Sequence, residues 1–152
     1  MYKSVLIILD INGVIGNRSY KDNKFILYEG AKDFLNYCYE LYSVGFYSSM
    51  VKKNLDTILK DILTPDQISK TICILDRRYT KKDESGKDPW STTKDVNLIK
   101  DKFKGYKVLI CDDDESKMKF NDPNDYIIVQ KFEDEVKNFE YIKNEIINKL
   151  KR

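Results

Sequence analysis

The apolar run VLIIL at residues 5–9 ends directly in a carboxylate, Asp10, and it constrains the fold of this chain more than any other segment. An unbroken run of branched apolar residues is typical of a strand that is buried on both faces, as in the centre of a parallel sheet. Gly13 lets the chain turn sharply after the run. Because ligands of open α/β sheets bind at the carboxyl ends of such strands, Asp10 is a candidate functional residue. This segment alone is equally compatible with a structural Asx turn at Asp10.

The length and composition of the chain narrow the class of protein. A chain of 152 residues, of which 41% are hydrophobic, is expected to fold as a single domain over residues 1–152. No apolar run approaches the roughly 18 residues that a membrane span needs, so we expect no membrane association. The strand at residues 5–9 follows the first residue too closely for a signal peptide, and this favours an intracellular protein of the cytoplasm or nucleus.

Cysteine, histidine and net charge exclude further classes of site. Cys38, Cys73 and Cys111 are odd in number and far apart, which fits neither a disulfide framework nor a zinc site. The chain contains no His, and this excludes His-based triads and most zinc catalysis. A net charge of +2 provides no global basic field of the kind that would demand a nucleic acid partner.

Segments with strand and helix patterns alternate along the chain. Strands are expected at residues 46–50, 71–75, 106–111 and 126–129, and helices from residue 30 to a closing Gly45, over about 51–62 with Pro65 just beyond, over 94–103, and over about 133–150 with Val136 on its inward stripe. Residues 12–28 are expected to form a loop or small hairpin, and residues 77–89 an exposed charged loop. The alternation predicts an α/β fold, a Rossmann-like doubly wound parallel sheet with helices on both faces.

Polar side chains follow the predicted strands. They are the carboxylate of Asp10, the hydroxyls of Ser48 and Ser49, and the acidic residues 112–114, while Lys94 lies just before the fourth strand. Because the carboxyl ends of parallel strands share one edge, these groups are expected to meet. Facing carboxylates repel unless a cation lies between them, and oxygen ligands suit Mg²⁺. A hydroxyl and an ammonium beside the metal could hold a phosphoryl group, and a carboxylate nucleophile can form an aspartyl-phosphate.

Each of these features alone also has a structural explanation. A Ser that follows a strand is commonly the N-cap of the next helix, and a surface Lys is commonly solvated. The acidic residues 112–114 could form a solvated turn. The functional interpretation therefore depends on the whole set occurring in this order along the chain.

Five segments in this order resemble the motifs of a known enzyme superfamily. They are residues 9–14 (LDINGV), 44–50 (VGFYSSM), 93–96 (TKDV), 109–113 (LICDD) and 121–124 (NDPN). Together they resemble the haloacid dehalogenase superfamily of aspartate-dependent phosphotransferases, and within it the branch of RNA polymerase II C-terminal-domain phosphatases. The first segment matches the opening motif Asp-x-Asp-Gly-Thr/Val except at Asn12.

The resemblance implies a role for each motif residue. The implied residues are Asp10, Asn12 and Lys94 for catalysis, Ser48, Ser49 and Lys94 for phosphate binding, and Asp10, the backbone carbonyl of Asn12 and Asp112 or Asp113 for Mg²⁺. Asp10 would attack phosphorus and form the covalent intermediate. The segments between the motifs are too short for a helical cap domain, and the resulting open site suits a macromolecular substrate such as a phosphorylated protein or peptide.

The same branch carries a substrate-facing insert between its second and third motifs, and residues 76–90 occupy the corresponding place here. Arg77 and Arg78 in this segment could recognise a phosphopeptide or a nucleic-acid end. A charged, solvated loop without a ligand is the structural alternative.

Asn12 is the main departure from the family pattern. The Asp that stands there in the family protonates the leaving oxygen and then activates water, whereas an amide cannot exchange a proton at neutral pH. General acid-base help is worth about 10²- to 10⁴-fold in rate. We therefore expect a slow or substrate-selective Mg²⁺-dependent phosphoprotein phosphatase. The alternatives are a non-catalytic phosphopeptide-binding module and a polynucleotide-end phosphatase.

Overall fold

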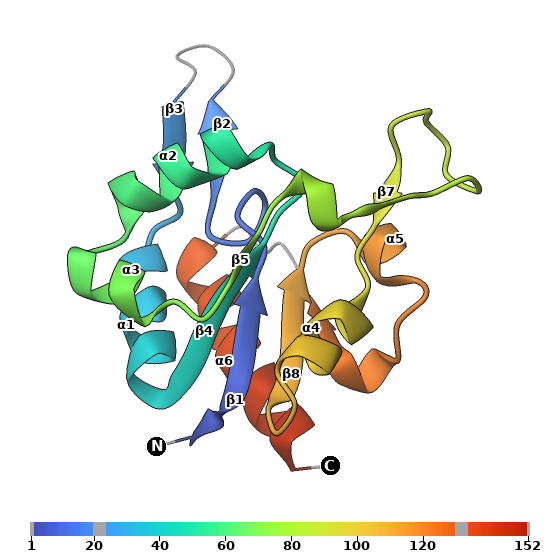
Figure 1. The fold of residues 1–152 in the computed structure, drawn as a ribbon. Coiled ribbons are helices and arrows are strands. Elements are labelled where there is room, and N and C mark those ends of the chain that lie inside the picture. Colours follow the sequence, from blue (N-terminus) through green and yellow to red (C-terminus); the bar gives the residue numbers. More distant parts are fainter. Residues whose placement is uncertain (1, 20–23, 130–133, 152) are drawn as a thin grey trace.

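The computed structural model describes residues 2–19, 24–129 and 134–151. Five parallel strands form a sheet in the order β5-β4-β1-β8-β9 (Figure 1). They are β1 (Tyr2–Leu9), β4 (Tyr42–Tyr47), β5 (Ile74–Leu75), β8 (Lys107–Asp112) and β9 (Tyr126–Ile128). The central strand β1 pairs on one side with β4 and on the other with β8, so that Leu9 lies level with both Phe46 and Cys111. The predicted central parallel strand is confirmed.

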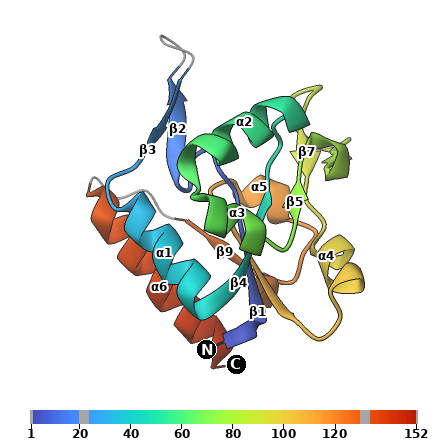
Figure 2. The ribbon, with the colours of Figure 1, turned by 60° about the vertical axis from the view of Figure 1, so that its left-hand side comes forward.

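Helices cover both faces of this sheet. They are α1 (Ala31–Leu41) and α6 (Glu135–Leu150) on one face and α4 (Val96–Lys102) and α5 (Glu115–Met118) on the other (Figures 1 and 2). Phe34 of α1 and Phe139 of α6 stack with ring centroids 4.9 Å apart. Alternate side chains of β1 are buried in two separate hydrophobic cores, one beneath each helical layer. The predicted doubly wound α/β fold is therefore correct.

Two hairpins extend from the edge of the sheet at which the carboxyl ends of the strands lie (Figure 1). The first, β2 (Gly16–Ser19) and β3 (Lys24–Leu27), confirms the hairpin expected within residues 12–28. The second, β6 (Lys81–Lys82) and β7 (Thr92–Thr93), frames the charged loop and follows a 3₁₀ turn at Arg77–Tyr79. The described residues contain no separate helical cap. None of their helices has both the length and the apolar character needed to cross a membrane.

One of two glycine and proline signals was misinterpreted in the sequence, and the other was incomplete. Gly45 does not close a helix but lies inside β4. Glycine is needed there because the side chains of Cys73 and Ile8 occupy the space where a Cβ would lie. Pro65 does lie beyond α2 (Lys52–Ile62), but it also begins a further helix, α3 (Pro65–Lys70). Thr64 caps that helix in a capping box, and Pro is favoured in the first helical turn.

Other element boundaries also differ from the prediction. The strand expected at residues 71–75 is reduced to Ile74–Leu75, and Lys94 precedes α4 instead of lying within it. The four-residue helix α5 and a 3₁₀ turn at Pro123–Asp125 were not predicted. Val136 does not join the inward stripe of α6 and is 42% exposed. The expected start of that helix at residue 133 lies outside the described residues.

Candidate active site

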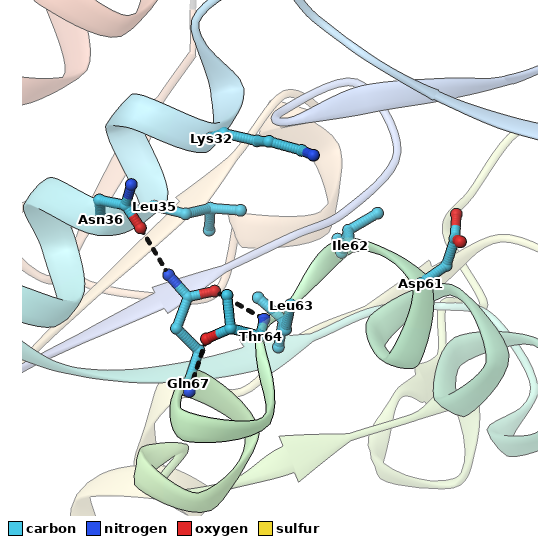
Figure 3. A pocket seen from close by; sticks show the side chains of 8 residues that line it. All are labelled: Lys32, Leu35, Asn36, Asp61, Ile62, Leu63, Thr64 and Gln67. Carbon is cyan, nitrogen blue, oxygen red and sulfur yellow. Dashed lines mark hydrogen bonds between the residues drawn. The ribbon is translucent and has the colours of Figure 1, made fainter.

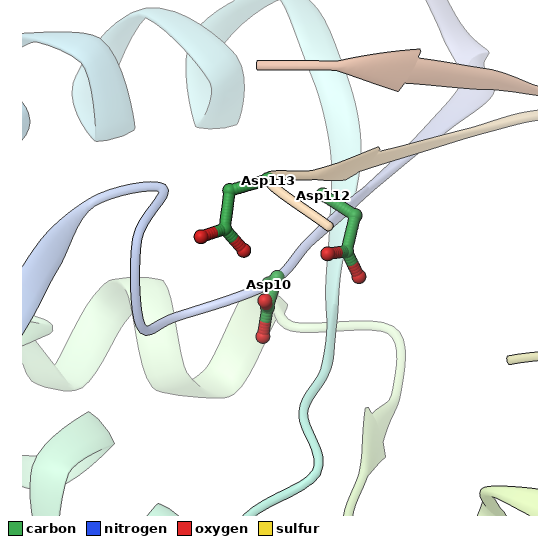
Figure 4. A group of neighbouring side chains, drawn as sticks. All are labelled: Asp10, Asp112 and Asp113. Atoms are coloured by element: carbon green, nitrogen blue, oxygen red, sulfur yellow. The ribbon is translucent and has the colours of Figure 1, made fainter. Parts of the chain in front are cut away.

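Three carboxylates gather at the carboxyl edge of the sheet (Figure 4). Asp10 follows β1, Asp112 ends β8, and Asp113 comes directly after it. They meet because β1 and β8 are neighbours whose register places Leu9 level with Cys111. One oxygen from each carboxylate lies within 4.8 Å of the others, and Asp10 and Asp112 are buried. Because like charges this close repel each other in a buried site, the cluster favours either a nearby cation or a proton on one of its carboxyls.

Lys94 supplies part of that positive charge from inside the protein. Its Nζ donates to Asp112 Oδ2 at 2.6 Å and to the Tyr47 carbonyl at 2.8 Å, and it lies 3.4 Å from Asp10 Oδ1. The side chain is fully buried. Burial by itself would lower the pKa of Lys94, but the carboxylates of Asp10 and Asp112 outweigh this effect and hold its pKa above the ordinary value. Lys94 is therefore a charged internal partner of the acidic cluster.

The protonation of Asp10 is finely balanced. Its pKa is raised to about 7, chiefly by burial, and the Asp112 and Asp113 carboxylates contribute in the same direction. The Lys94 ammonium and the backbone N–H of Ile11, which donates to Asp10 Oδ1 at 2.8 Å, act in the opposite direction. A divalent cation beside this group would favour its ionised form. A cluster of oxygen donors that lacks sufficient counter-charge fits a hard cation such as Mg²⁺.

An open cleft of about 360 Å³ gives access to this cluster. It is lined by Asp10, Asn12, Ser48, Ser49, Met50, Asp113, Asp114 and Lys117. Ser48 lies at the end of β4 and accepts a hydrogen bond at Oγ from the Met50 N–H at 3.1 Å. The structure thus brings the predicted serines beside Asp10, whereas Lys94 is not among the residues that line the cleft.

Asn12 and Gly13 form the turn that leads out of β1. Asn12 lines the cleft, and its side-chain Oδ1 accepts a hydrogen bond from the Arg18 N–H of the first hairpin at 3.1 Å. This bond leaves the amide NH₂ as the donor for other groups. Gly13 has a φ of +85°, and a Cβ at this position would overlap the Asp113 carboxylate. Both the backbone conformation and the close approach of Asp113 therefore require glycine.

The two arginines expected to contact substrate do not line the cleft. Arg78 forms a two-pronged ion pair with the buried Asp76, with both N–O distances at 3.0 Å. Arg77 is exposed, and its backbone N–H donates to the carbonyl of Met50 at the edge of the cleft. The structure places the pair beside the site rather than in it.

Lys117 is a cleft residue that the sequence analysis missed. It lies on α5, three residues after Asp114, whose side chain caps that helix. A four-residue helix has no periodic pattern, so its presence was not predicted. The only sign in the sequence that Lys117 could lie near the acidic cluster was its position three residues after the acidic run 112–114.

A second hollow of about 210 Å³ lies between α1 and the α2–α3 corner (Figure 3). Three of its polar side chains, those of Asn36, Thr64 and Gln67, are hydrogen-bonded within the hollow. Gln67 donates to Asn36 Oδ1 at 2.8 Å and forms the capping box with Thr64. This hollow serves helix packing and lies apart from the carboxylate cluster.

The family model for NLI interacting factor-like phosphatases matches residues 3–151. Comparison with curated protein sequences gave no match. Among solved structures, the chain is similar to Fcp1, an essential RNA polymerase II CTD phosphatase, with a TM-score of 0.60 and 16% identity over 97% of this chain. It is also similar to a variant of the fission yeast RNA polymerase II CTD phosphatase Fcp1 bound to beryllium fluoride, with a TM-score of 0.54 and 14% identity over 97% of this chain. The chain covers 50% of each of those structures, and identities this low show a common fold alone.

Proposed function

We propose that this chain, which belongs to the NLI interacting factor-like phosphatase family, is a phosphatase. This family lies in the C-terminal-domain phosphatase-like branch of the haloacid dehalogenase superfamily. The proposed reaction is Mg²⁺-dependent hydrolysis of a phosphate monoester through an aspartyl-phosphate on Asp10. The observation that carries this proposal is the cluster of Asp10, Asp112 and Asp113, of which Asp10 and Asp113 line an open cleft and Asp112 is hydrogen-bonded to the buried Lys94.

Each functional residue would contribute to a different part of the reaction. A carboxylate oxygen of Asp10 attacks phosphorus, the bond to the ester oxygen breaks, and the leaving oxygen takes its proton from solvent water, because Asn12 cannot supply one. Water then attacks the phosphoryl group on Asp10, which releases inorganic phosphate and restores the carboxylate. Ser48 and Ser49 would donate to the phosphoryl oxygens. Lys94 holds Asp10 in place through its fixed ammonium, so its proposed contribution is to position the nucleophile.

Asp10, the backbone carbonyl of Asn12 and Asp113 would hold Mg²⁺, which neutralises charge on the phosphoryl group when it is bound. Asp113 is preferred to Asp112 because it lines the cleft. Both oxygens of Asp112 already accept hydrogen bonds, from Lys94 Nζ at 2.6 Å and from the Asp114 N–H at 2.9 Å. Asp112 would therefore orient Lys94.

Mg²⁺ binding is expected to depend on pH through Asp10. Because the pKa of Asp10 is raised to about 7, its carboxyl is largely protonated at pH 6, and Mg²⁺ must displace that proton. We expect the affinity to be roughly tenfold weaker at pH 6 than at pH 8. Calorimetry at the two pH values measures this, and Asp10→Asn should remove the difference. Equal affinity at both values in the unaltered protein would contradict the proposed role of Asp10 as a ligand.

The proposed substrate is a phosphoserine or phosphothreonine peptide of another protein, and the proposed location of this chain is intracellular, in the cytoplasm or nucleus. An open cleft without a helical cap among the described residues supports a macromolecular substrate. Asn12 supports a second candidate, a non-catalytic phosphopeptide-binding module, since an amide cannot transfer a proton. A polynucleotide end has weaker support, because Arg78 is already paired with Asp76.

Phosphate release tests these candidates directly. The unaltered protein should release phosphate from an aryl phosphate in Mg²⁺, more slowly from a phosphoserine peptide, and not after chelation of the metal. Asp10→Asn should reduce turnover roughly 10³-fold or more, because the nucleophile is lost. Release from 3′- or 5′-phosphorylated oligonucleotides but not from peptides would favour the polynucleotide reaction. Peptide binding without any release would favour the binding module.

A further inference from the structure

The cleft has a strong imbalance of charge. Asp10, Asp113 and Asp114 contribute carboxylates, and Lys117 provides the positive charge among the described lining residues. Lys94 is fully buried, with its ammonium directed at two carboxylates and a carbonyl. A phosphate dianion that enters this cleft therefore meets Lys117 as its accessible protein cation.

The contacts of the Lys117 side chain leave its charge without a carboxylate partner in the described part of the chain. Its Nζ lies 3.2 Å from Ser49 Oγ and 3.4 Å from Thr92 Oγ1, both of them neutral hydroxyls. Nearby lysines differ in this respect: Lys119 pairs with Asp83 at 2.6 Å, and Lys81 pairs with Asp95 at 2.9 Å. An ammonium held by hydroxyls beside an open cleft remains available to an anion.

The backbone of Lys117 is joined to the segment that carries Lys94. The carbonyl of Lys117 accepts the N–H of Lys94 at 2.8 Å, and the N–H of Lys117 donates to the carbonyl of Asp114 at 3.1 Å. The two lysines are thus supported by the same contact between α5 and the segment before α4. One ammonium points to the buried carboxylates, and the other lies beside Ser49 at the cleft.

We propose that Lys117 binds the phosphate group of the substrate, together with the hydroxyl of Ser49. This inference rests on the proposed function and assigns a different task to each lysine. Lys94 positions Asp10, whereas Lys117 forms a charge-assisted hydrogen bond with a phosphoryl oxygen as a compact point charge. Because this contact exists before the reaction as well as during it, its removal should raise KM far more than it lowers kcat.

Lys117→Gln is the variant that tests the proposal, and Lys119→Gln is its matched control. Both remove one positive charge from the same short stretch, but Lys119 faces Asp83 instead of the cleft. In saturating Mg²⁺, the dissociation constant of inorganic phosphate, measured by calorimetry, should rise roughly ten- to a hundredfold in Lys117→Gln. It should change little in Lys119→Gln, and Lys117→Arg should retain most of the affinity. The KM for an aryl phosphate should rise in parallel.

Phosphate binding is measured without turnover, so the two proposals can fail separately. If no substrate is turned over but Lys117→Gln loses phosphate affinity, the phosphatase proposal fails and the role of Lys117 stands. If turnover proceeds and phosphate affinity is the same in Lys117→Gln, the role of Lys117 is overturned. It is also overturned if the unaltered protein binds no phosphate, if Lys119→Gln has an equal effect, or if Lys117→Gln weakens only peptide binding. A lower melting temperature of Lys117→Gln with unchanged phosphate affinity would also overturn it, because the side chain would then have a purely structural role.

Discussion

Asn12→Asp should raise the turnover of a phosphoserine peptide by about 10²-fold or more, the usual contribution of a general acid and base. A serine alkoxide is a poor leaving group and must be protonated as it departs, and the amide of Asn12 cannot supply a proton. The local structure should tolerate this substitution. Asn12 lines the cleft, and a carboxylate there can accept the same Arg18 N–H that the amide oxygen accepts now.

The dependence on leaving group gives this prediction a second readout. Aryl phosphates leave as fairly stable anions, so Asn12→Asp should increase their turnover much less than that of phosphoserine. Asn17→Asp is the matched control, because it makes the same chemical change on β2, outside the cleft lining, and should alter neither rate. If Asn12→Asp folds and binds Mg²⁺ but remains inert, the missing acid does not limit this site. The binding-module interpretation would then be preferred.

Lys94→Met should cost about 3–5 kcal/mol of the free energy of unfolding, the range expected when one partner of a buried ion pair is removed. Its ammonium is fully buried and lies between Asp112 at 2.6 Å and Asp10 at 3.4 Å. Without it, two buried carboxylates face each other with no internal counter-charge. Urea unfolding at pH 8 without metal measures the loss, and added Mg²⁺ should restore part of the stability by binding the folded state.

Lys100→Met is the matched control for burial. Lys100 pairs with Asp125 at the same distance, 2.6 Å, but its side chain is 40% exposed, so its loss should cost below about 1 kcal/mol. The cost of Lys94→Met should also shrink at low pH. Removal of the ammonium raises the pKa of Asp10 further above its unfolded value, so the folded variant binds more protons and gains stability as the pH falls. Equal losses in the two variants would contradict the view of Lys94 as the internal counter-ion of the site.

The parts of this fold that could be predicted are those with a local pattern. The run at residues 5–9 indicated a strand buried on both faces, and β1 has side chains in both hydrophobic cores. The meeting of Asp10 with Asp112 and Asp113 followed from a rule of topology, because parallel neighbours end at one edge. Both inferences needed only sequence order and the period of apolar residues.

The remaining features depend on tertiary contacts that have no local pattern. A Gly at position 45 could equally close a helix or allow close packing in a strand, and the side chains of Ile8 on β1 and of Cys73, just before β5, are what require glycine there. Arg78 is paired with Asp76 and does not line the cleft, whereas the sequence shows only an arginine in a charged loop. The burial of Lys94 and the exposure of Lys117 to the cleft depend on α5, which is too short to be recognised. The different tasks that we propose for the two lysines could therefore not be separated from the sequence.

The central claim is that Asp10 becomes phosphorylated, and trapping of the covalent intermediate tests it most directly. Asn12 cannot activate water for the second step, so the phosphoenzyme should accumulate when the leaving group is good. After rapid mixing with an aryl phosphate in Mg²⁺ and acid quenching, mass spectrometry should find one added phosphoryl group on the peptide that contains Asp10. Hydroxylamine should remove it, and Asp10→Asn should abolish it. Phosphate release with no modification of Asp10, or with a phosphoryl group on another residue, would contradict the account.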